Sequence, residues 1–218
     1  MFYDSLTFTV RKSNSLILAR TRLSLIEMRL INYVVAQNKP TDEKFNTVEV
    51  PVKAFNDFYA NNSNNYYRFK DIAEKLLEIT ITISEEQDLN WFEYSEYLAG
   101  LGILRLRLNS ALKTYLLNLQ RDFVEYDLNC IKNLKHIWSI RLFELLKADE
   151  THRYSLENLR NILGLDQQEY TQYASFKKKI LLWAQKEIND TCDISFSFRE
   201  IKRSRRVLGI IFLVFAEP

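Results

Sequence analysis

The chain has 218 residues, of which 47% are hydrophobic and 27% charged, a balance typical of a folded globular protein and not of a disordered one. It contains only 4 glycines and no GxxxxGK[ST] motif, so a glycine-lined phosphate loop is excluded. The net charge of +2 does not by itself indicate a nucleic-acid partner.

No segment predicts export or membrane insertion. The first residues lack an apolar core followed by a cleavage site, so we expect no signal peptide. The longest apolar run, 207–216, is far shorter than the roughly 20 residues of a membrane helix. Cys130 and Cys192 are isolated in sequence, which favours two reduced thiols. We therefore expect a soluble cytoplasmic protein.

The first half of the chain predicts helices followed by strands. A helix begins at Ser24, which forms a capping-box pattern with Glu27, and Pro40 follows its end. The run 48–60 predicts a short strand and a helix. The run 66–83 predicts a helix that gives way to an alternating strand. A turn-rich stretch around Trp91 and Phe92 precedes a strand at 102–109, GILRLRLN.

The same order then recurs. After connecting helices at 111–120 and 127–134, we expect a helix at 135–149, a strand and helix at 154–165, a helix at 170–190 and two strands within 194–215. IEMRLINYV in the first half matches WSIRLFELL in the second. The pattern predicts an α+β chain of two tandem winged helix-turn-helix domains joined by a helical connection. We place the domains at 1–120 and 121–218.

Charge is unevenly distributed along the chain. Between Gln172 and Arg206 there are nine basic and four acidic residues, so this window carries +5 and the remainder −3. Such asymmetry indicates a surface that faces a polyanion.

The predicted third helix of the second domain carries much of this charge. Phe176, Ile180, Ala184 and Ile188 recur every four residues and should face the core. Lys178, Gln185 and Asn189 should lie opposite, with Lys179 and Lys186 to one side. Base edges in the major groove are best reached from the N-terminal end of such a helix. The candidates there are Gln172, Ser175, Lys178 and Lys179. Lys177 lies nearer the core, so a phosphate contact suits it better.

A basic turn follows between the last two strands, at Lys202, Arg203, Ser204, Arg205 and Arg206. One interpretation is a solvated hairpin tip whose charges prevent edge-to-edge aggregation. The other is a wing that lies over DNA phosphates or enters the adjacent minor groove. The basic helix at winged-helix spacing favours the wing.

The comparable positions in the first domain are less basic. Tyr66, Tyr67, Arg68 and Lys70 begin its third helix, but Asp71 and Glu74 follow. Arg105 and Arg107 lie on a strand. Structural roles and weak contacts with the DNA backbone both remain open for these residues.

Catalysis has little support in the sequence. His136 and His152 have no metal-ligand spacing to each other or to a cysteine. A strand-nicking nuclease would need clustered histidines near a nucleophilic tyrosine, and that cluster is missing. We therefore expect no enzymatic activity, no catalytic residues, no metal and no cofactor.

Four stretches in order resemble the initiator replication proteins of iteron-containing plasmids, and the resemblance runs from about Lys12 to Phe215. They are SNSLILARTRLSLIEMRLINYVVAQ, SIRLFELLK, LENLRNILGL followed by YASFKKKILLWAQKEIND, and DISFSFREIKRSRRVLGIIFLVF. The resemblance implies two winged helices, the C-terminal one binding directly repeated origin sites, largely through its third helix. The N-terminal one would add DNA contacts or mediate dimerisation. Dimers in this family often repress the initiator's own promoter.

At the matching positions the resemblance points to Lys177, Lys178 and Lys179 for DNA, with Arg203, Arg205 and Arg206 on the wing. Arg141 in SIRLFELL matches a family arginine expected to orient its helix or touch phosphate. Our leading hypothesis is an initiator that binds repeated duplex sites in a plasmid origin, forms a homodimer through its N-terminal domain and recruits host helicase or initiator proteins. The alternatives are a dedicated winged-helix transcriptional repressor, a rolling-circle nicking enzyme, and a protein-interaction role with a merely solvated wing.

Overall fold

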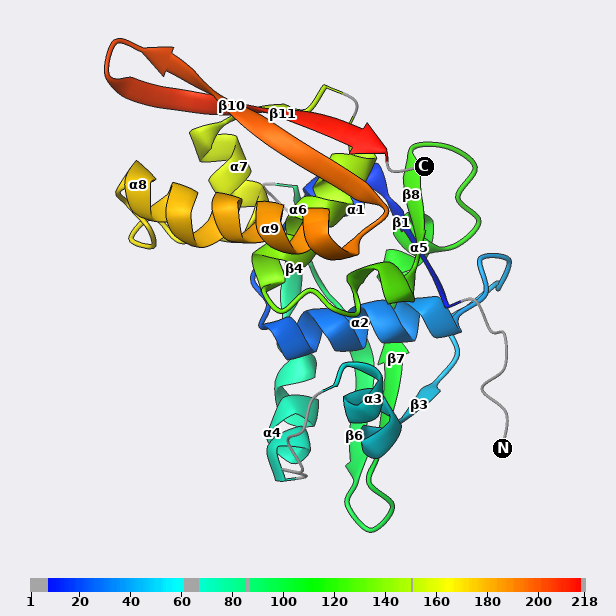
Figure 1. Cartoon of the computed structure of the whole chain (residues 1–218). Helices are drawn as coiled ribbons and strands as arrows, with labels where there is room; N and C mark the ends of the chain where they lie inside the picture. The colour runs from blue at the N-terminus through cyan, green and yellow to red at the C-terminus, as the bar shows by residue number, and fades with distance from the viewer. Residues whose placement is uncertain (1–7, 61–66, 85–86, 150, 217–218) are drawn as a thin grey trace.

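Two units of the same architecture follow each other along the chain (Figure 1). They are described from a computed structural model for residues 8–60, 67–84, 87–149 and 151–216. The first unit contains α2 (Leu25–Gln37), β3 (Val48–Pro51), α3 (Val52–Phe58), α4 (Tyr67–Leu76), β6 (Phe92–Leu98) and β7 (Ile103–Leu108). The second contains α6 (Ile137–Ala148), β9 (Arg153–Ser155), α7 (Leu156–Ile162), α8 (Tyr173–Phe176), α9 (Leu182–Thr191), β10 (Ile194–Arg203) and β11 (Arg206–Ala216).

Both units have the same sheet topology. β3 pairs with β7 and β7 with β6, just as β9 pairs with β11 and β11 with β10, always antiparallel. In each unit the short strand leads directly into the second helix and lies beside the returning strand of the hairpin. Helix, strand–helix, helix and hairpin define a winged helix. The prediction of an α+β chain with two winged helices is therefore confirmed.

Several elements lie outside the repeat. β1 (Thr9–Ser13) pairs with β8 (Phe123–Asp127), and β2 (Arg20–Thr21) pairs with β4 (Thr80–Ser84), which pairs with β5 (Gln87–Asn90). The short helices are α1 (Asn14–Leu18) and α5 (Lys113–Leu116), with 3₁₀ turns at Ser110–Leu112 and Leu128–Ile131.

These additional elements differ from the sequence prediction in two places. The connection between the units is helical only in part, because β8 runs through it. The expected turn-rich stretch around Trp91 contains β5 and the start of β6. Both differences involve short strands, and β8 pairs with β1 more than 100 residues away. No local pattern reveals a partner at that separation.

The predicted start of α2 is confirmed in atomic detail. The Ser24 Oγ accepts from the Glu27 N–H at 3.4 Å, and a Glu27 carboxylate oxygen accepts from the Ser24 N–H at 2.7 Å. This capping box satisfies two otherwise unpaired backbone donors. Helix α2 thereby begins directly after the segment 20–23, which lies against the second unit.

A buried ion pair joins the N-terminal strand to α6. The Lys12 ammonium donates to Glu144 Oε1 at 2.7 Å, and the Tyr126 hydroxyl donates to the same oxygen at 2.6 Å. Lys12 and Glu144 are both almost completely buried. Burial lowers the pKa of Lys12, against the opposing effect of Glu144. A charge buried this deeply is tolerated only while its partner is present.

Arg141 of α6 holds three segments together. Its guanidinium donates to the carbonyl oxygens of Ile17, Ala19 and Ile162 at 2.9, 2.9 and 2.8 Å. Only 3% of the residue is exposed, and burial lowers its pKa. Of the two roles expected for Arg141, the structure supports orientation of its helix, because the guanidinium is bonded to three backbone carbonyls and only its edge reaches the pocket between the units.

Arg29 occupies the matching position on α2, as the alignment of IEMRLINYV with WSIRLFELL predicts. Its guanidinium donates to the Leu134 carbonyl at 3.0 Å and lies 4.5 Å from the centre of the Tyr59 ring. Arg29 therefore contacts the segment before α6, while Arg141 contacts the segment before α2. The two units hold each other through equivalent arginines.

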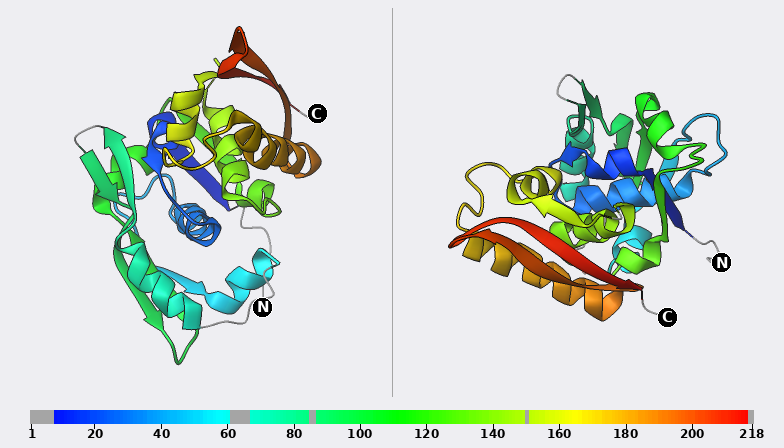
Figure 2. Two further views of the ribbon diagram at one scale, coloured as in Figure 1. Left: turned by 90° about the vertical axis from the view of Figure 1, so that its left-hand side faces the viewer. Right: turned by 90° about the horizontal axis from the view of Figure 1, so that it is seen from above.

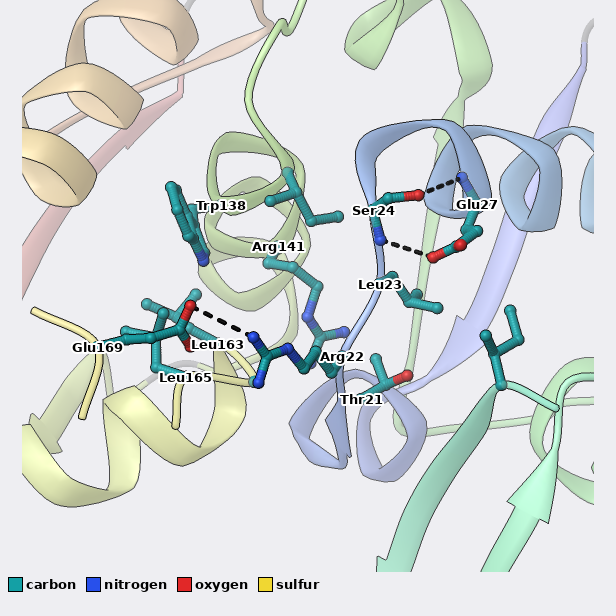
Figure 3. A pocket seen from close by; sticks show the side chains of 13 residues that line it. Thr21, Arg22, Leu23, Ser24, Glu27, Trp138, Arg141, Leu163, Leu165 and Glu169 are labelled. Atoms are coloured by element: carbon teal, nitrogen blue, oxygen red, sulfur yellow. Dashed lines mark hydrogen bonds and ion pairs between the residues drawn. The ribbon is translucent and has the colours of Figure 1, made fainter. Parts of the chain in front are cut away.

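A pocket of about 470 Å³ lies where the units meet (Figure 3). Arg22 of the first unit forms ion pairs with Asp166 and Glu169 of the second. The Arg20 guanidinium also lies 3.2 Å from a carboxylate oxygen of Asp166. Gly164 ends α7 with a φ of +71°, and a Cβ there would lie 2.2 Å from the Thr21 carbonyl oxygen. Only glycine permits so close an approach.

Candidate nucleic-acid interface

The third helix of the second unit contains a π-helical turn. α8 runs without interruption into this turn at Lys177–Leu181, which continues as α9 (Figure 1). Phe176, Ile180, Ala184 and Ile188 are all buried, as their spacing predicts. Turns of this kind are rare in helices and frequent at functional sites. Here the turn contains the three consecutive lysines.

The solvent-facing side of this helix is basic. Lys178, Lys179 and Lys186 are exposed, and within the described residues no carboxylate lies within 4.0 Å of any of their ammonium groups. Lys179 lies 5.8 Å from the centre of the Tyr170 ring. Three unopposed cations on one exposed helix face provide the electrostatic surface that duplex DNA requires.

Gln185 and Asn189 do not lie on this face, and their placement opposite the core was wrong. The Gln185 and Asn189 amides donate to the Phe196 carbonyl at 2.9 and 3.0 Å, and the Phe196 N–H donates to Asn189 Oδ1 at 2.8 Å. Both side chains tie α9 to β10. A bond with a strand's backbone is invisible in the periodicity of the helix alone.

The N-terminal end of the helix carries the other predicted base contacts. Gln172 is exposed directly before α8, and Ser175 is half-buried one turn later. The Gln172 side chain makes no capping hydrogen bond with the helix. Both residues lie at the same end of the helix as Lys178.

Lys177 and Lys202 converge on one carboxylate. Glu200 accepts from Lys177 Nζ at 2.7 Å, from Lys202 Nζ at 2.6 Å and from the Tyr173 hydroxyl at 2.8 Å. These three donors lower the pKa of Glu200 to about 2, Lys177 making the largest contribution. Burial and the bond with Glu200 raise the pKa of Tyr173. Lys177 thus joins the third helix to β10, while the ammonium of Lys202 is paired within β10 itself.

The tip of the second wing remains unopposed. β10 and β11 turn through Ser204, whose φ of +54° gives the tight reversal, and Arg203 pairs with Arg206 across it. Lys202 and the four residues from Arg203 to Arg206 are all exposed. No ion pair forms at Arg203, Arg205 or Arg206 in the part of the chain that the structure describes. The wing lies along the same side of the second unit as α8 and α9 (Figure 2).

The first unit presents a different surface. Arg68 and Lys70 are exposed on α4, whereas Tyr66 and the side chain of Tyr67 lie outside the described residues. In the first wing, Arg105 donates to Glu49 at 2.9 Å and Arg107 donates to Glu93 at 2.7 Å. Both arginines are thus paired with carboxylates on the adjacent strands β3 and β6.

Models of one protein family match both halves of the chain. The model described as initiator replication protein, WH1, matches residues 9–147, and the one described as initiator Rep protein, WH2, matches residues 155–214. The chain belongs to the initiator replication protein family. A search of curated proteins found no match.

A solved structure shares the whole architecture of this initiator. It is the crystal structure of the Pi initiator protein in complex with iteron DNA, with a TM-score of 0.79, 18% sequence identity, and coverage of 98% of this chain and 99% of that chain. At this identity the similarity establishes the fold, with both winged helices in the same order.

The described residues of the initiator hold no group of three or more histidine, cysteine and acidic side chains that could bind a metal. His136 Nδ1 lies 2.8 Å from Glu187 Oε1, and its ring lies 5.1 Å from that of Trp183. His152 takes a φ of +47° near the start of β9. The histidines thus occupy separate structural environments.

The two cysteines of the initiator are free thiols that approach each other. The Cys192 thiol donates to the Cys130 carbonyl at 3.1 Å. Burial raises the pKa of both thiols, that of Cys192 to about 12, so neither is activated as a nucleophile.

Within the described ranges, no helix is long and apolar enough to cross a membrane.

Sequence reasoning missed one exposed pair on the third helix. Leu182 and Trp183 are exposed large apolar side chains next to the lysines. Both residues lie off the buried stripe formed by Ile180, Ala184 and Ile188, so their exposure follows from their position on the helix and not from their apolar character. An apolar pair inside a basic helix would have been the signal to look for.

Proposed function

We propose that this initiator binds directly repeated sites of duplex DNA in a plasmid origin through its second winged helix. The unopposed basic surface formed by the third helix and the wing of that unit carries the proposal. It comprises Lys178, Lys179, Lys186, Arg203, Arg205 and Arg206. The relative of the same fold is a complex with iteron DNA.

In this proposal Gln172, Ser175, Lys178 and Lys179 read base edges from the N-terminal part of the helix. Arg203, Ser204, Arg205 and Arg206 contact the backbone from the wing, joined by Lys186. Lys177 joins the helix to the wing through Glu200, to which Lys202 of the same strand also bonds, and both lysines contribute their remaining donors to phosphates.

The first unit serves assembly and backbone contact. Arg68 and Lys70, exposed on α4, contact the DNA backbone together with Tyr67, and a homodimer forms through this unit. The division at residue 120 separates these two roles. Sedimentation of the free protein and of its origin complex tests the dimer, which should be present without DNA.

Bound to its repeats in the cytoplasm, the initiator recruits host helicase or initiator proteins and represses its own promoter, without enzymatic activity or a cofactor. Disrupting the gene on its plasmid should abolish replication, and supplying the protein in trans should restore it. A dedicated repressor would leave replication intact. Incubation of supercoiled plasmid with the protein and Mg²⁺ should give no nicked circles, whereas a nicking enzyme would produce them.

Binding to the plasmid's origin repeats and to a scrambled duplex tests the central claim. We expect tighter, salt-sensitive binding to the repeats, and equal affinities would contradict specific recognition. Lys178→Ala should reduce the preference for the repeats by about tenfold, because a lost base contact affects only the cognate site. Arg205→Ala should weaken both duplexes about equally, by roughly fivefold. Equal losses on both duplexes for both variants would show that our division between reading and positioning is wrong.

A further inference from the structure

An exposed leucine lies in the middle of the basic face of the third helix. Leu182 is 43% exposed and follows Lys179 by three residues and precedes Lys186 by four. Residues at these spacings are neighbours on a helix surface. Leu182 is two positions from both Ile180 and Ala184, which are buried. It therefore lies on the side of α9 that points away from the core.

The other exposed apolar residue on this helix has a structural explanation. The Trp183 ring lies 5.1 Å from the His136 ring, and His136 is bound to Glu187 one turn further along α9. Trp183 thus covers the junction with the segment before α6. Leu182 belongs neither to the core of the described chain nor to the partly buried residues packed against it, and its exposed side chain lies on the helix face that carries Lys179 and Lys186.

The partner that fits this surface is the major groove of DNA. The flanking lysines attract phosphates and disfavour an apolar protein surface, because burying their charges without partners is costly. Within the major groove, the one apolar group that a base pair presents is the 5-methyl group of thymine. We propose that Leu182 contacts a thymine methyl group and makes the initiator prefer thymine at one position of its site. This inference rests on the proposed function and adds a specificity determinant to it.

Leucine supplies what the neighbouring lysines cannot. A lysine ammonium bonds to guanine or to phosphate and does not distinguish thymine from uracil, since both have the same O4 acceptor. A contact with the methyl group distinguishes them. Replacing one thymine by deoxyuridine removes this group alone and leaves every hydrogen-bonding atom in place.

The experiment begins with a random duplex pool, from which the full chain selects its preferred site. Each thymine of that site is then replaced by dU, one at a time, and binding is measured for wild type, Leu182→Ala and Leu77→Ala. Leu77 is a matched control because it is 38% exposed directly after α4, in the first unit. Alanine is a better helix former than leucine, so Leu182→Ala should fold normally, which its circular dichroism will confirm.

For wild type and Leu77→Ala, one dU substitution should weaken binding about fourfold, the effect of burying one methyl-sized group. Leu182→Ala should bind the thymine and dU duplexes equally. If wild type tolerates dU at every position, or if Leu182→Ala keeps the sensitivity, the leucine contact is refuted while specific binding stands. A pool without any enriched sequence would instead refute specific DNA binding itself, and with it this inference.

Discussion

Both wings contain arginines, two in the first and four in the second, and the wings differ in what surrounds these residues. In the first wing, Arg105 and Arg107 bond with Glu49 and Glu93 on adjacent strands. In the second, Arg203, Arg205 and Arg206 lie in or beside a two-residue turn, and none of them forms an ion pair within the described chain. The number of basic residues on a strand therefore says little about DNA binding. The placement of the acids decides which cations remain available to a polyanion.

The first helices of the two units invite the same comparison. Arg141 satisfies three backbone carbonyls, whereas its equivalent Arg29 satisfies one and stacks on Tyr59. Equivalent positions have thus acquired unequal importance for stability. Substitutions at matched positions of the two units measure this inequality directly.

The largest effect is expected at Arg141. Arg141→Ala should lower the free energy of unfolding by about 4 kcal/mol, because it leaves buried carbonyls without donors, and Arg29→Ala by about 2 kcal/mol. Urea denaturation measures both. Arg205→Ala, at an exposed position, serves as the control and should change stability by less than about 0.5 kcal/mol. Equal losses at Arg29 and Arg141 would remove the distinction between the units.

Removing arginines should weaken DNA binding strongly when they come from the second wing and only slightly when they come from the first. The triple variant of Arg203, Arg205 and Arg206 to alanine should bind origin repeats about two orders of magnitude more weakly near 0.15 M salt, with a salt slope reduced by about 3. The double variant Arg105→Ala and Arg107→Ala should lose little. Fluorescence anisotropy across a salt series measures both. A comparable loss in the double variant would place the first wing on the DNA as well.

The smallest effect concerns acid stability. The pKa of Glu200 is about 2 in the folded chain, below its usual 4.5, so its stabilisation is present above about pH 4.5 and is lost as the pH falls toward 2. Glu200→Gln should therefore be less stable than wild type by about 1 kcal/mol at pH 6, a value discounted because Lys177 and Lys202 are partly exposed. The two proteins should converge near pH 2.

Glu93 in the first wing provides the matched carboxylate. The Ser110 N–H and Arg107 lower the pKa of Glu93. Like Glu200, it therefore stabilises the fold at neutral pH and loses this contribution as the pH falls. Thermal unfolding from pH 2 to 7 should show a smaller difference for Glu93→Gln than for Glu200→Gln. A constant difference between wild type and Glu200→Gln at every pH would mean that charge is not the cause.

Periodicity and order were enough to predict both winged helices, the capping box at Ser24 and the buried stripe of the third helix. The basic helix and the basic turn then favoured a DNA-binding wing, and resemblance to the family narrowed the function to a replication initiator. The structure was needed where partners are distant in sequence. Examples are the strand pair β1–β8, the bonds from Gln185 and Asn189 to Phe196, and the shared carboxylate of Glu200.

The role proposed for Leu182 could not be predicted for a different reason. The spacing of the buried stripe does place Leu182 away from the core, but a lone apolar residue on an exposed face is common and does not by itself indicate a function. The base contacts assigned to Gln172, Ser175, Lys178 and Lys179 remain predictions.

The N-terminal strand has a thermodynamic consequence for the whole molecule. Lys12 neutralises Glu144 of the second unit's first helix, and the carbonyls of Ile17 and Ala19 receive Arg141. Unfolding of either unit alone would therefore leave a buried charge without its partner in the other unit, at a cost of several kcal/mol. Calorimetry should record one cooperative transition, and a fragment that lacks residues 9–20 should fail to refold.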